Sequence, residues 1–401
     1  PGARPKAWVC CQFGAREHYA IPRALHRAGV LRTLVTDAWV RPGSPIGRLS
    51  ARLSERFHPE LAGVDVRALT ARLVAREAGW RLSPRPEWET TMRRNEWFQR
   101  QSVRLLSSLR GEQVVFAHSY SARLIFRLAK ARGWPTVLGQ IDPGIAHFAI
   151  ARRLAAEAPQ FGPPPPEPPP RYFEEWRDEC ATADCIVVNS EWSRQSLAQA
   201  GIDPGKVTVV PLAYEPAVPS DSPRRSYPSS FTPGRPLRLL FAGTQSVVKG
   251  LPVLLEAMSA LRGEPVTLRL VGERGMSIPP ELVPRESVEL VGPVARSEVM
   301  RHYGECDVLI FPSHSDGFGM VQVEAQAAGL PIVASRHCGR VAEDGRTGIV
   351  LSEVSPAVLT AAIRSLLEQP AMLARFSEAA RSQRPSSVAA LGAALLAAVP
   401  A

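Results

Sequence analysis

Two carboxylates, Asp316 and Glu324, stand eight positions apart in a stretch that runs from Val308 to Ala334 and reads VLIFPSHSDGFGMVQVEAQAAGLPIVA. The first lies in a polar loop and the second inside a helical pattern. Gly317 and Gly319 let the backbone of the loop pass close to a ligand. The helix N-terminus behind these glycines attracts anions. The stretch therefore predicts a ligand-binding loop that favours negative charge.

The elements that must position these residues can be read from the same stretch. Residues 308–311, VLIF, form an apolar run without alternation, which predicts a strand covered on both faces. The segment from Met320 to Ala328 predicts a helix that stops at Gly329, and PIVAS predicts a second buried strand. A loop at the carboxyl end of such a strand is where open α/β sheets bind ligands. A purely structural strand-turn-helix is the alternative.

The stretch resembles the donor-binding signature of the retaining, GT-B-fold glycosyltransferases of family 4 (glycosyl transferases group 1). That signature is a carboxylate, Gly-Phe-Gly, and a Glu eight positions after the first carboxylate. Asp316 here replaces the usual first Glu. The positions that match are Gly317, Phe318, Gly319, Glu324, Ala325, Gly329 and Pro331.

A second resemblance lies in the loop AGTQSVVKG, which follows the apolar run from Leu237 to Phe241. Gly243, Lys249 and Gly250 match the family motif, while Thr244 replaces its basic residue. An ammonium aimed at a nucleotide diphosphate stabilises the leaving group as the glycosidic bond breaks, more than it stabilises the ground state. Arg274 is a candidate to replace the lost basic residue, and backbone NH groups are the alternative. A plain surface lysine is the alternative for Lys249.

The resemblance implies a donor site without metal or cofactor, for a UDP- or GDP-type nucleotide sugar. Glu324 would hold ribose hydroxyls, Asp316 would hold sugar hydroxyls, and Lys249 would contact the diphosphate. The remaining donor-binding candidates are Gly14, Gly243, Thr244, Arg274, Val291, Gly317, Phe318, Gly319, Met320 and Val321.

The N-terminal stretch predicts a strand from Ala7 to Phe13, a turn at Gly14 and then a helix. In the resembling family this loop lies beside the donor phosphates and the acceptor. Arg16 and His18 are therefore candidates on the acceptor side. For His18, an ordinary residue at the start of a helix is an equal alternative.

The family often places a His-Asp pair after the strand at 136–139, with the His reaching the donor sugar. Here Ile141 occupies the His position, and Asp142 keeps the second place. His118, which follows the neighbouring strand QVVFA, is a candidate to replace the missing His, as is Gln140. Asp142 and His118 thus join Lys249 and the two carboxylates as candidate catalytic residues.

A chain of 401 residues exceeds what one core usually supports, so we expect two domains. The resemblance implies an α/β fold of the GT-B type, with two Rossmann-like, doubly wound parallel-sheet domains facing a cleft. It also implies that residues 1–215 bind the acceptor and that 237–379 bind the nucleotide sugar, while the Pro- and Ser-rich composition of 216–236 predicts a linker between them. A helix within 380–401 would pack back on the first domain.

The net charge of +10 lies almost entirely in residues 1–100, which hold 18 Lys and Arg against 9 Asp and Glu. This basic region could meet an anionic membrane surface. Genome composition and a solvated face are the alternative. No nucleic-acid module stands out, and no run of eighteen apolar residues predicts a spanning helix. We expect a cytoplasmic protein, peripheral at the inner membrane face, with six cysteines as buried thiols.

These observations predict a retaining glycosyltransferase that moves a sugar from a nucleotide sugar to a glycan or glycolipid hydroxyl. Assembly of a bacterial polysaccharide, lipopolysaccharide or glycolipid is the expectation at the level of the family. One alternative is a GT-B nucleotide-sugar 2-epimerase, which would act without an acceptor. Another is a two-lobed binding protein without activity.

Overall fold

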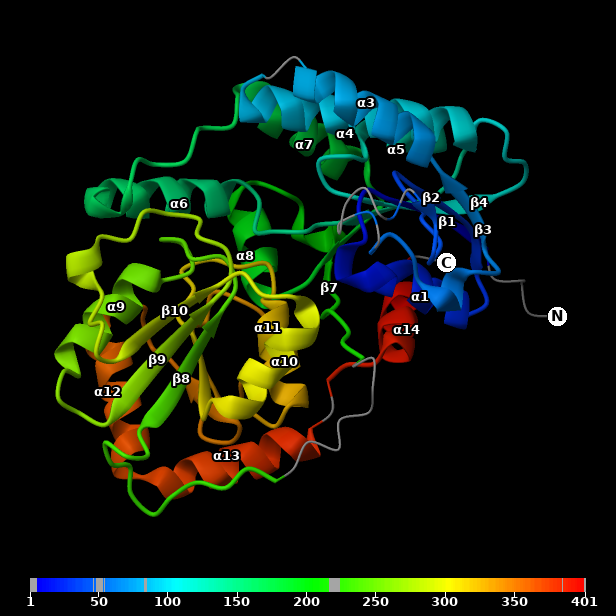
Figure 1. Cartoon of the computed structure of the whole chain (residues 1–401). Helices are drawn as coiled ribbons and strands as arrows, with labels where there is room; N and C mark the ends of the chain where they lie inside the picture. The colour runs from blue at the N-terminus through cyan, green and yellow to red at the C-terminus, as the bar shows by residue number, and fades with distance from the viewer. Residues whose placement is uncertain are drawn as a thin grey trace.

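The computed structural model describes residues 6–45, 47, 53, 55–82, 85–215, 224–383 and 385–399. Its first domain is built on a parallel sheet with the order β3-β2-β1-β4-β5-β6-β7 (Figure 1). The strands are β1 (Ala7–Gln12), β2 (Leu31–Thr36), β3 (Asp65–Ala68), β4 (Gln113–His118), β5 (Thr136–Gly139), β6 (Cys185–Val188) and β7 (Val207–Val209). The order reverses between β1 and β4, which creates a crevice at their carboxyl ends.

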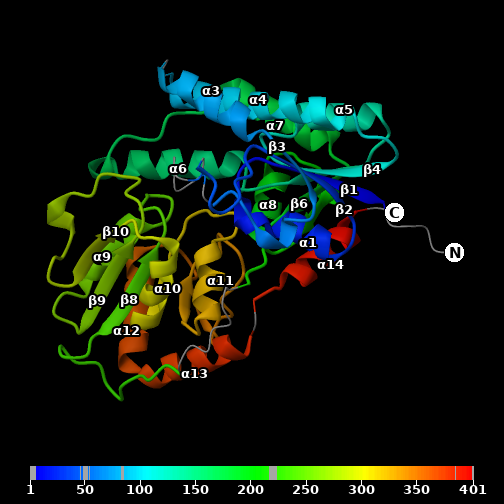
Figure 2. The same ribbon diagram turned by 45° about the vertical axis from the view of Figure 1, so that its right-hand side comes forward.

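Helices cover both faces of this sheet because alternate strand residues point to opposite sides. Val9 and Cys11 of β1 pack in one apolar cluster, and Trp8 and Cys10 pack in another. The helices of the domain are α1 (Ala20–Arg27), α3 (Thr70–Leu82), α4 (Glu87–Leu106), α5 (Arg123–Ala131), α6 (Ile145–Glu157), α7 (Pro170–Thr182) and α8 (Glu191–Gln199). Helices α4, α5 and α7 lie together on one face, and α1 lies on the other (Figure 2).

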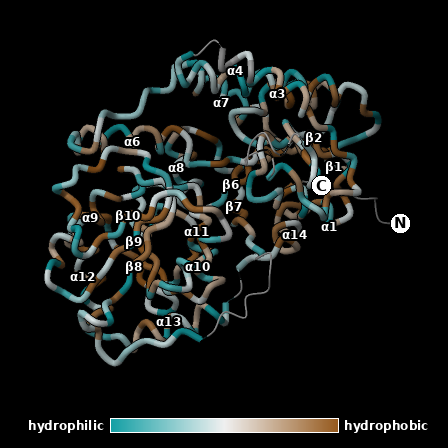
Figure 3. The backbone as a smooth tube through the Cα atoms, in the orientation of Figure 1, coloured by the Kyte–Doolittle hydropathy of each residue, from teal (hydrophilic) through white to brown (hydrophobic). Residues whose placement is uncertain are grey.

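The second domain has a parallel sheet with the order β10-β9-β8-β11-β12-β13. Its strands are β8 (Leu237–Ala242), β9 (Val266–Val271), β10 (Val288–Gly292), β11 (Val308–Phe311), β12 (Ile332–Ala334) and β13 (Gly348–Val350). Its helices are α9 (Leu251–Ala260), α10 (Arg296–Glu305), α11 (Met320–Ala327), α12 (Pro356–Glu368) and α13 (Pro370–Ser382). Hydrophobic residues concentrate in the strands of both domains (Figure 3).

The C-terminal helix α14 (Val388–Ala398) returns to the first domain, where it lies beside α1. Val388, Leu391 and Leu395 are buried in the same cluster as Ala24 and Leu25 of α1. The helix lies within the predicted range 380–401, and it begins at Val388 because α13 ends at Ser382 and the Ser387 side chain caps α14 by accepting from Ala390 N. Residues 384, 400 and 401 lie outside the described residues.

Two further segments differ from the sequence predictions. The described residues of 41–110 are mainly helical, but they also contribute the edge strand β3, which the sequence did not predict. Residues 216–223 of the predicted linker lie outside the described residues. Its remainder packs on the second domain, where the Arg225 guanidinium donates to Cys306 O at 2.6 Å and Tyr227 OH donates to Asp307 O at 3.3 Å. The exact domain boundaries stay predictions.

Candidate functional site

The charged centre of the site is an ion pair between two residues that the sequence predicts to bind the donor. Lys249, in the loop after β8, donates to Oδ2 of Asp316, in the loop after β11. The Lys249 ammonium also lies 5.5 Å from the centroid of the Phe311 ring. Gly250 follows at φ +75°, and a Cβ there would collide with the carbonyl oxygen of Pro312. Only glycine therefore lets the two loops approach in this way.

The loop after β11 is held in one conformation by its own backbone. Asp316 N donates to His337 O at 2.8 Å, and Phe318 N donates to Asp316 Oδ1 at 3.2 Å. Gly319, at φ +84°, packs against Phe311, whose ring would lie 2.6 Å from an added Cβ. The backbone of this loop is thus fixed at the N-terminus of α11, the end of a helix that favours anions.

Residues of α11 and β10 form the wall next to this loop. Met320 and Val321, at the start of α11, and Val291, near the end of β10, are half-buried against the same apolar cluster. Glu324 lies one turn further along α11, where its Oε2 accepts from the Tyr303 hydroxyl at 2.9 Å. Tyr303 was missed in the sequence because a buried aromatic residue on α10 reads as core. Its hydroxyl fixes the orientation of the Glu324 carboxylate.

The loops after β8 and β9 lie side by side. Gly272 approaches Gly243 so closely that a Cβ on Gly272 would collide with the carbonyl oxygen of Gly243. Gln245 and Arg274 form an isolated parallel bridge, and both Thr244 and Arg274 have exposed side chains. The structure therefore brings Arg274 next to the loop of Lys249.

The first domain meets the donor loop at the residues after β5. A Cβ on Gly317 would lie 2.6 Å from Ile141 O and 3.4 Å from Asp142 Cα, so the two domains touch at this glycine. The Asp142 Oδ1 atom accepts three hydrogen bonds, from the hydroxyl of Tyr120 at 2.8 Å, Nε2 of Gln140 at 3.0 Å and the backbone N of Gly144 at 2.8 Å. Asp142 is thus a rigid acceptor at the domain interface.

Ser315 joins the two domains through a pair of aromatic side chains. Its Oγ lies 3.2 Å from Nδ1 of His147 on α6 and accepts from Nε1 of Trp192 on α8 at 3.2 Å. Burial lowers the pKa of His147, while the nearby carboxylates of Asp142 and Asp316 raise it and Lys249 lowers it. His147 therefore lies among predicted site residues of both domains. The signal in the sequence was a His five positions after Asp142, near the start of a helix.

The loop after β1 has an unusual backbone. Gly14 N donates to Oδ1 of the buried Asp37 at 2.9 Å, which fixes the turn. Glu17, His18 and Tyr19 then follow at φ +44°, +51° and +60°, the left-handed region that non-glycine residues rarely adopt. The predicted helix consequently begins at Ala20 instead of directly after the turn.

Arg16 and His18, the candidates on the acceptor side, are both half-buried in this loop. Strained non-glycine residues of this kind cluster at functional sites.

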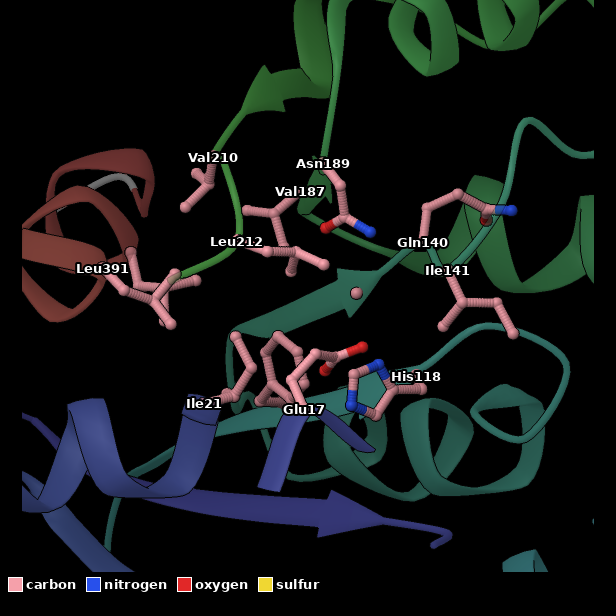
Figure 4. Close-up of a pocket in the computed structure, with 13 residues that line it drawn as sticks. Glu17, Ile21, His118, Gln140, Ile141, Val187, Asn189, Val210, Leu212 and Leu391 are labelled. Atoms are coloured by element: carbon pink, nitrogen blue, oxygen red, sulfur yellow. The ribbon is translucent and has the colours of Figure 1, made fainter. Parts of the chain in front are cut away.

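His118, the candidate to replace the missing His, lies in a cavity of the first domain and does not line the donor loop (Figure 4). The cavity is lined by residues of β4, β5 and β6, by the segments that follow β1, β5, β6 and β7, and by α1 and α14. Burial lowers the pKa of His118 to about 3, so the imidazole is neutral at physiological pH. Glu17, which was not predicted, lines the same cavity.

The arrangement can hold an anionic ligand between a lysine, a helix N-terminus and two carboxylates that suit hydroxyl groups. Among the described residues, no three His, Cys, Asp or Glu side chains gather in a way that could hold a metal ion. No described helix has the length and apolar composition needed to cross a bilayer. All six cysteines are buried free thiols.

Comparison with known proteins places this site in a family. Residues 46–217 match the family model described as Glycosyltransferase Family 4, and residues 236–369 match the model described as Glycosyl transferases group 1. The D-inositol 3-phosphate glycosyltransferase of Acidothermus cellulolyticus is 31% identical over 363 residues, which cover 84% of this chain and 72% of the relative. The chain belongs to glycosyltransferase family 4.

Other relatives of this family-4 chain match over a shorter region. The D-inositol 3-phosphate glycosyltransferase of Kineococcus radiotolerans is 33% identical over 218 residues, 47% of this chain and 50% of the relative. The match thus spans about half the length of that curated relative.

Among solved structures, Anabaena HepE in complex with UDP and glucose aligns with a TM-score of 0.61 over 98% of both chains, at 16% identity. The lipopolysaccharide glycosyltransferase WaaG aligns with a TM-score of 0.55 over 93% of this chain and 94% of the other, also at 16% identity. These likenesses confirm the predicted two-domain GT-B fold.

Proposed function

We propose that this chain is a retaining glycosyltransferase that moves a sugar from a UDP- or GDP-sugar to a hydroxyl group of a glycan or glycolipid acceptor. The observation that carries the proposal is the meeting of Lys249 and Asp316 beside Gly317, where the two domains touch. In this proposal the cation binds the diphosphate and the carboxylate binds the sugar hydroxyls. The complex of HepE with UDP and the names of the inositol phosphate relatives support a nucleotide donor and a hydroxyl acceptor.

In the proposed mechanism, Lys249 and the N-terminus of α11 stabilise negative charge on the departing diphosphate. Glu324, oriented by Tyr303, holds the ribose hydroxyls. The departing phosphate oxygen takes the proton of the acceptor hydroxyl, so the sugar bond forms on the face from which the diphosphate leaves. On the side of the first domain, Asp142 and His147 line the position of the sugar.

A thermal-shift panel of nucleotide sugars tests donor binding directly. A ligand at about 100 times its Kd stabilises the folded chain by roughly 2.7 kcal/mol, which raises the Tm measurably.

Lys249→Ala should lower kcat/KM by roughly tenfold or more, because it removes one charged contact made in the transition state. An unchanged kcat/KM would exclude Lys249 from the mechanism. NMR of the product's anomeric proton reports whether configuration is retained.

Incubation with the donor alone separates the alternatives. A 2-epimerase would convert the nucleotide sugar without an acceptor. A binding protein would show a higher Tm with nucleotide but would release no product. The family relatives favour transfer over both.

The last part of the proposal concerns cellular location and pathway. The enzyme would be cytoplasmic, lie at the inner membrane face and act in polysaccharide, lipopolysaccharide or glycolipid assembly. The basic region would provide the membrane contact. Several of its arginines already pair with glutamates on α3 and α4, as Arg94 does with Glu77 and Arg100 with Glu96. Co-sedimentation with vesicles containing phosphatidylglycerol, compared with neutral phosphatidylcholine vesicles, tests this contact.

A further inference from the structure

Three polar side chains of the first domain face one small cavity. Figure 4 shows the Glu17 carboxyl group and the His118 ring turned toward one another, with the Asn189 amide facing them from the far side. His118 is only 6% exposed, and neither of its ring nitrogens makes a hydrogen bond of standard geometry in the described part of the chain, where the Gly139 backbone is the one group close enough to raise the pKa of the ring. Buried polar groups are nearly always hydrogen-bonded, so these nitrogens indicate a ligand group that the fold itself does not supply.

The chemistry of the lining defines that group. The neutral His118 ring presents one donor and one acceptor, and a hydroxyl group can satisfy either one. Burial raises the pKa of Glu17, which shows that the cavity disfavours charge, although the nearby Arg16 partly offsets this effect. Gln140 also lines the cavity, but its amide is already bonded to Asp142 and Trp176, and the other lining side chains are apolar, namely Ile21, Phe116, Ile141, Val187, Val210, Leu212, Leu391 and Leu395. An anion such as a phosphate would meet the Glu17 carboxyl group and lose its hydration here.

The size of the cavity fits a single small group. Its volume is about 20 Å³, which exceeds the roughly 10–15 Å³ that one water-sized group needs. A ring or a whole sugar does not fit in this volume. The cavity can therefore receive one hydroxyl or hydroxymethyl group from a larger molecule that lies outside it.

The cavity lies next to the donor loop. Ile141 lines the cavity with its side chain, and its carbonyl oxygen packs against Gly317 of the second domain. Glu17 follows β1 and His118 ends β4, so the cavity opens at the reversal point of the sheet, where α/β folds bind ligands. A molecule anchored here would extend toward Lys249 and Asp316.

The backbone also holds Glu17 in place. Glu17, His18 and Tyr19 adopt left-handed conformations that cost roughly 1–3 kcal/mol each. Gln12 Nε2 supports the loop by donating to Gly14 O at 3.0 Å and Arg16 O at 3.3 Å. A loop fixed in this way directs Glu17 into the cavity before any ligand arrives.

We propose that Glu17, His118 and Asn189 form an acceptor subsite that binds one uncharged hydroxyl or hydroxymethyl group of the acceptor. The subsite rests on the proposed transferase function and deepens it, because it requires a neutral polyol portion in the acceptor. It also gives Glu17 a role in acceptor specificity that is separate from donor binding.

NMR of protein labelled with ¹³C and ¹⁵N at histidine tests the subsite without any activity assay. The His118 ring signals are assigned by their loss in a His118→Gln variant, and the exposed His26 serves as the internal reference. Glycerol and myo-inositol, titrated separately, should shift the His118 signals and leave those of His26 unchanged. Inorganic phosphate should have no such effect.

Glu17→Gln and Asn189→Ala should each weaken the response, raising the apparent Kd for the polyol by about fivefold, the effect of one lost hydrogen bond. The proposal is overturned if neither polyol moves the His118 signals, which would mean a buried water only, or if phosphate moves them instead. An apparent Kd for the polyol that is the same in both variants as in the parent protein would also overturn it. Titration with UDP, followed by thermal shift, reports separately on the donor site, so a failure of the transferase proposal remains distinguishable.

Discussion

Lys249 and Asp316 form an ion pair with one another, although they lie 67 positions apart in the sequence. Both side chains are largely buried, with 27% and 14% of their side-chain areas exposed. The ammonium that would bind a diphosphate is therefore already held by a carboxylate. Under the proposed function, a nucleotide would compete with Asp316 for Lys249, and the sugar hydroxyls would then offer Asp316 new partners.

Asp316→Asn should separate these two roles. The variant releases the Lys249 ammonium and removes a negative charge near the diphosphate, so the Kd for UDP or GDP should fall by roughly threefold or more. Transfer should nevertheless become slower, because the amide is a weaker acceptor for sugar hydroxyls than the carboxylate. Calorimetry with the free nucleotide and a transfer assay measure the two effects. Glu343→Gln, which changes an exposed carboxylate paired with Arg346, is the matched control and should alter neither.

Glu324→Gln tests the second carboxylate. If Glu324 accepts hydrogen bonds from the ribose, its neutralisation should raise the Kd for the nucleotide by about tenfold, as expected for a lost hydrogen bond to a charged group. Tyr303→Phe should have a smaller effect, since it removes only the hydroxyl that orients the carboxylate. Glu305→Gln, on the same helix as Tyr303, is the control and should leave the Kd for the nucleotide unchanged. Equal affinities in all four proteins would argue against a nucleotide at Glu324.

Gly317→Ala should obstruct the contact between the domains. The added methyl group would lie 2.6 Å from Ile141 O, a distance at which the backbone must move. We expect transfer to decrease strongly while nucleotide binding to the second domain changes little. Gly304→Ala is the matched control, because a Cβ at that helical position has no neighbour within 4 Å. This second variant should be neutral or stabilise the helix by up to about 1 kcal/mol.

The stability of the fold should decrease in acid because of His118. Its pKa is 6.5 in the reference state and about 3 when buried, so between these values the unfolded chain binds a proton that the folded chain does not. The free energy of unfolding therefore decreases as the pH falls from 6.5 toward 3. At pH 5 the loss relative to pH 8 is about 2 kcal/mol.

Urea denaturation of His118→Gln at the two pH values checks this prediction. The variant lacks the titrating group and should lose less stability than the parent protein on acidification. His26→Gln, which removes an exposed histidine, should keep the parent dependence. If the free energy of unfolding fell by the same amount between the two pH values in His118→Gln and in the parent, the prediction would be contradicted.

The sequence predicted the order of strands and helices well where each strand is buried on both faces. VLIF at 308–311 is one example, because burial on both sides requires an unbroken apolar run. The edge strand β3 was missed because DVRA is partly exposed and carries no such run. The late start of α1 was missed because three left-handed residues in a row, Glu17 to Tyr19, leave no signal when none is glycine.

The donor residues were predicted to lie together because their motifs are local, each on one loop after one strand. Residues that act across the domain interface were not predicted. His147 and Trp192 reach Ser315 only after both domains have folded and met, so their relation depends on contacts between positions more than 100 residues apart. Glu17 stands between the two predicted acceptor candidates, but only the folded loop shows that it faces His118.

The path of the chain has a mechanical consequence. It passes from the first domain to the second between Val210 and Leu237, and it returns between Ser382 and Val388, where α14 packs beside α1. Two covalent connections therefore join the same two domains. These two connections limit how far the domains can separate or rotate relative to one another. Under the proposed function, both connections would keep the donor and acceptor domains together while substrates bind and products leave.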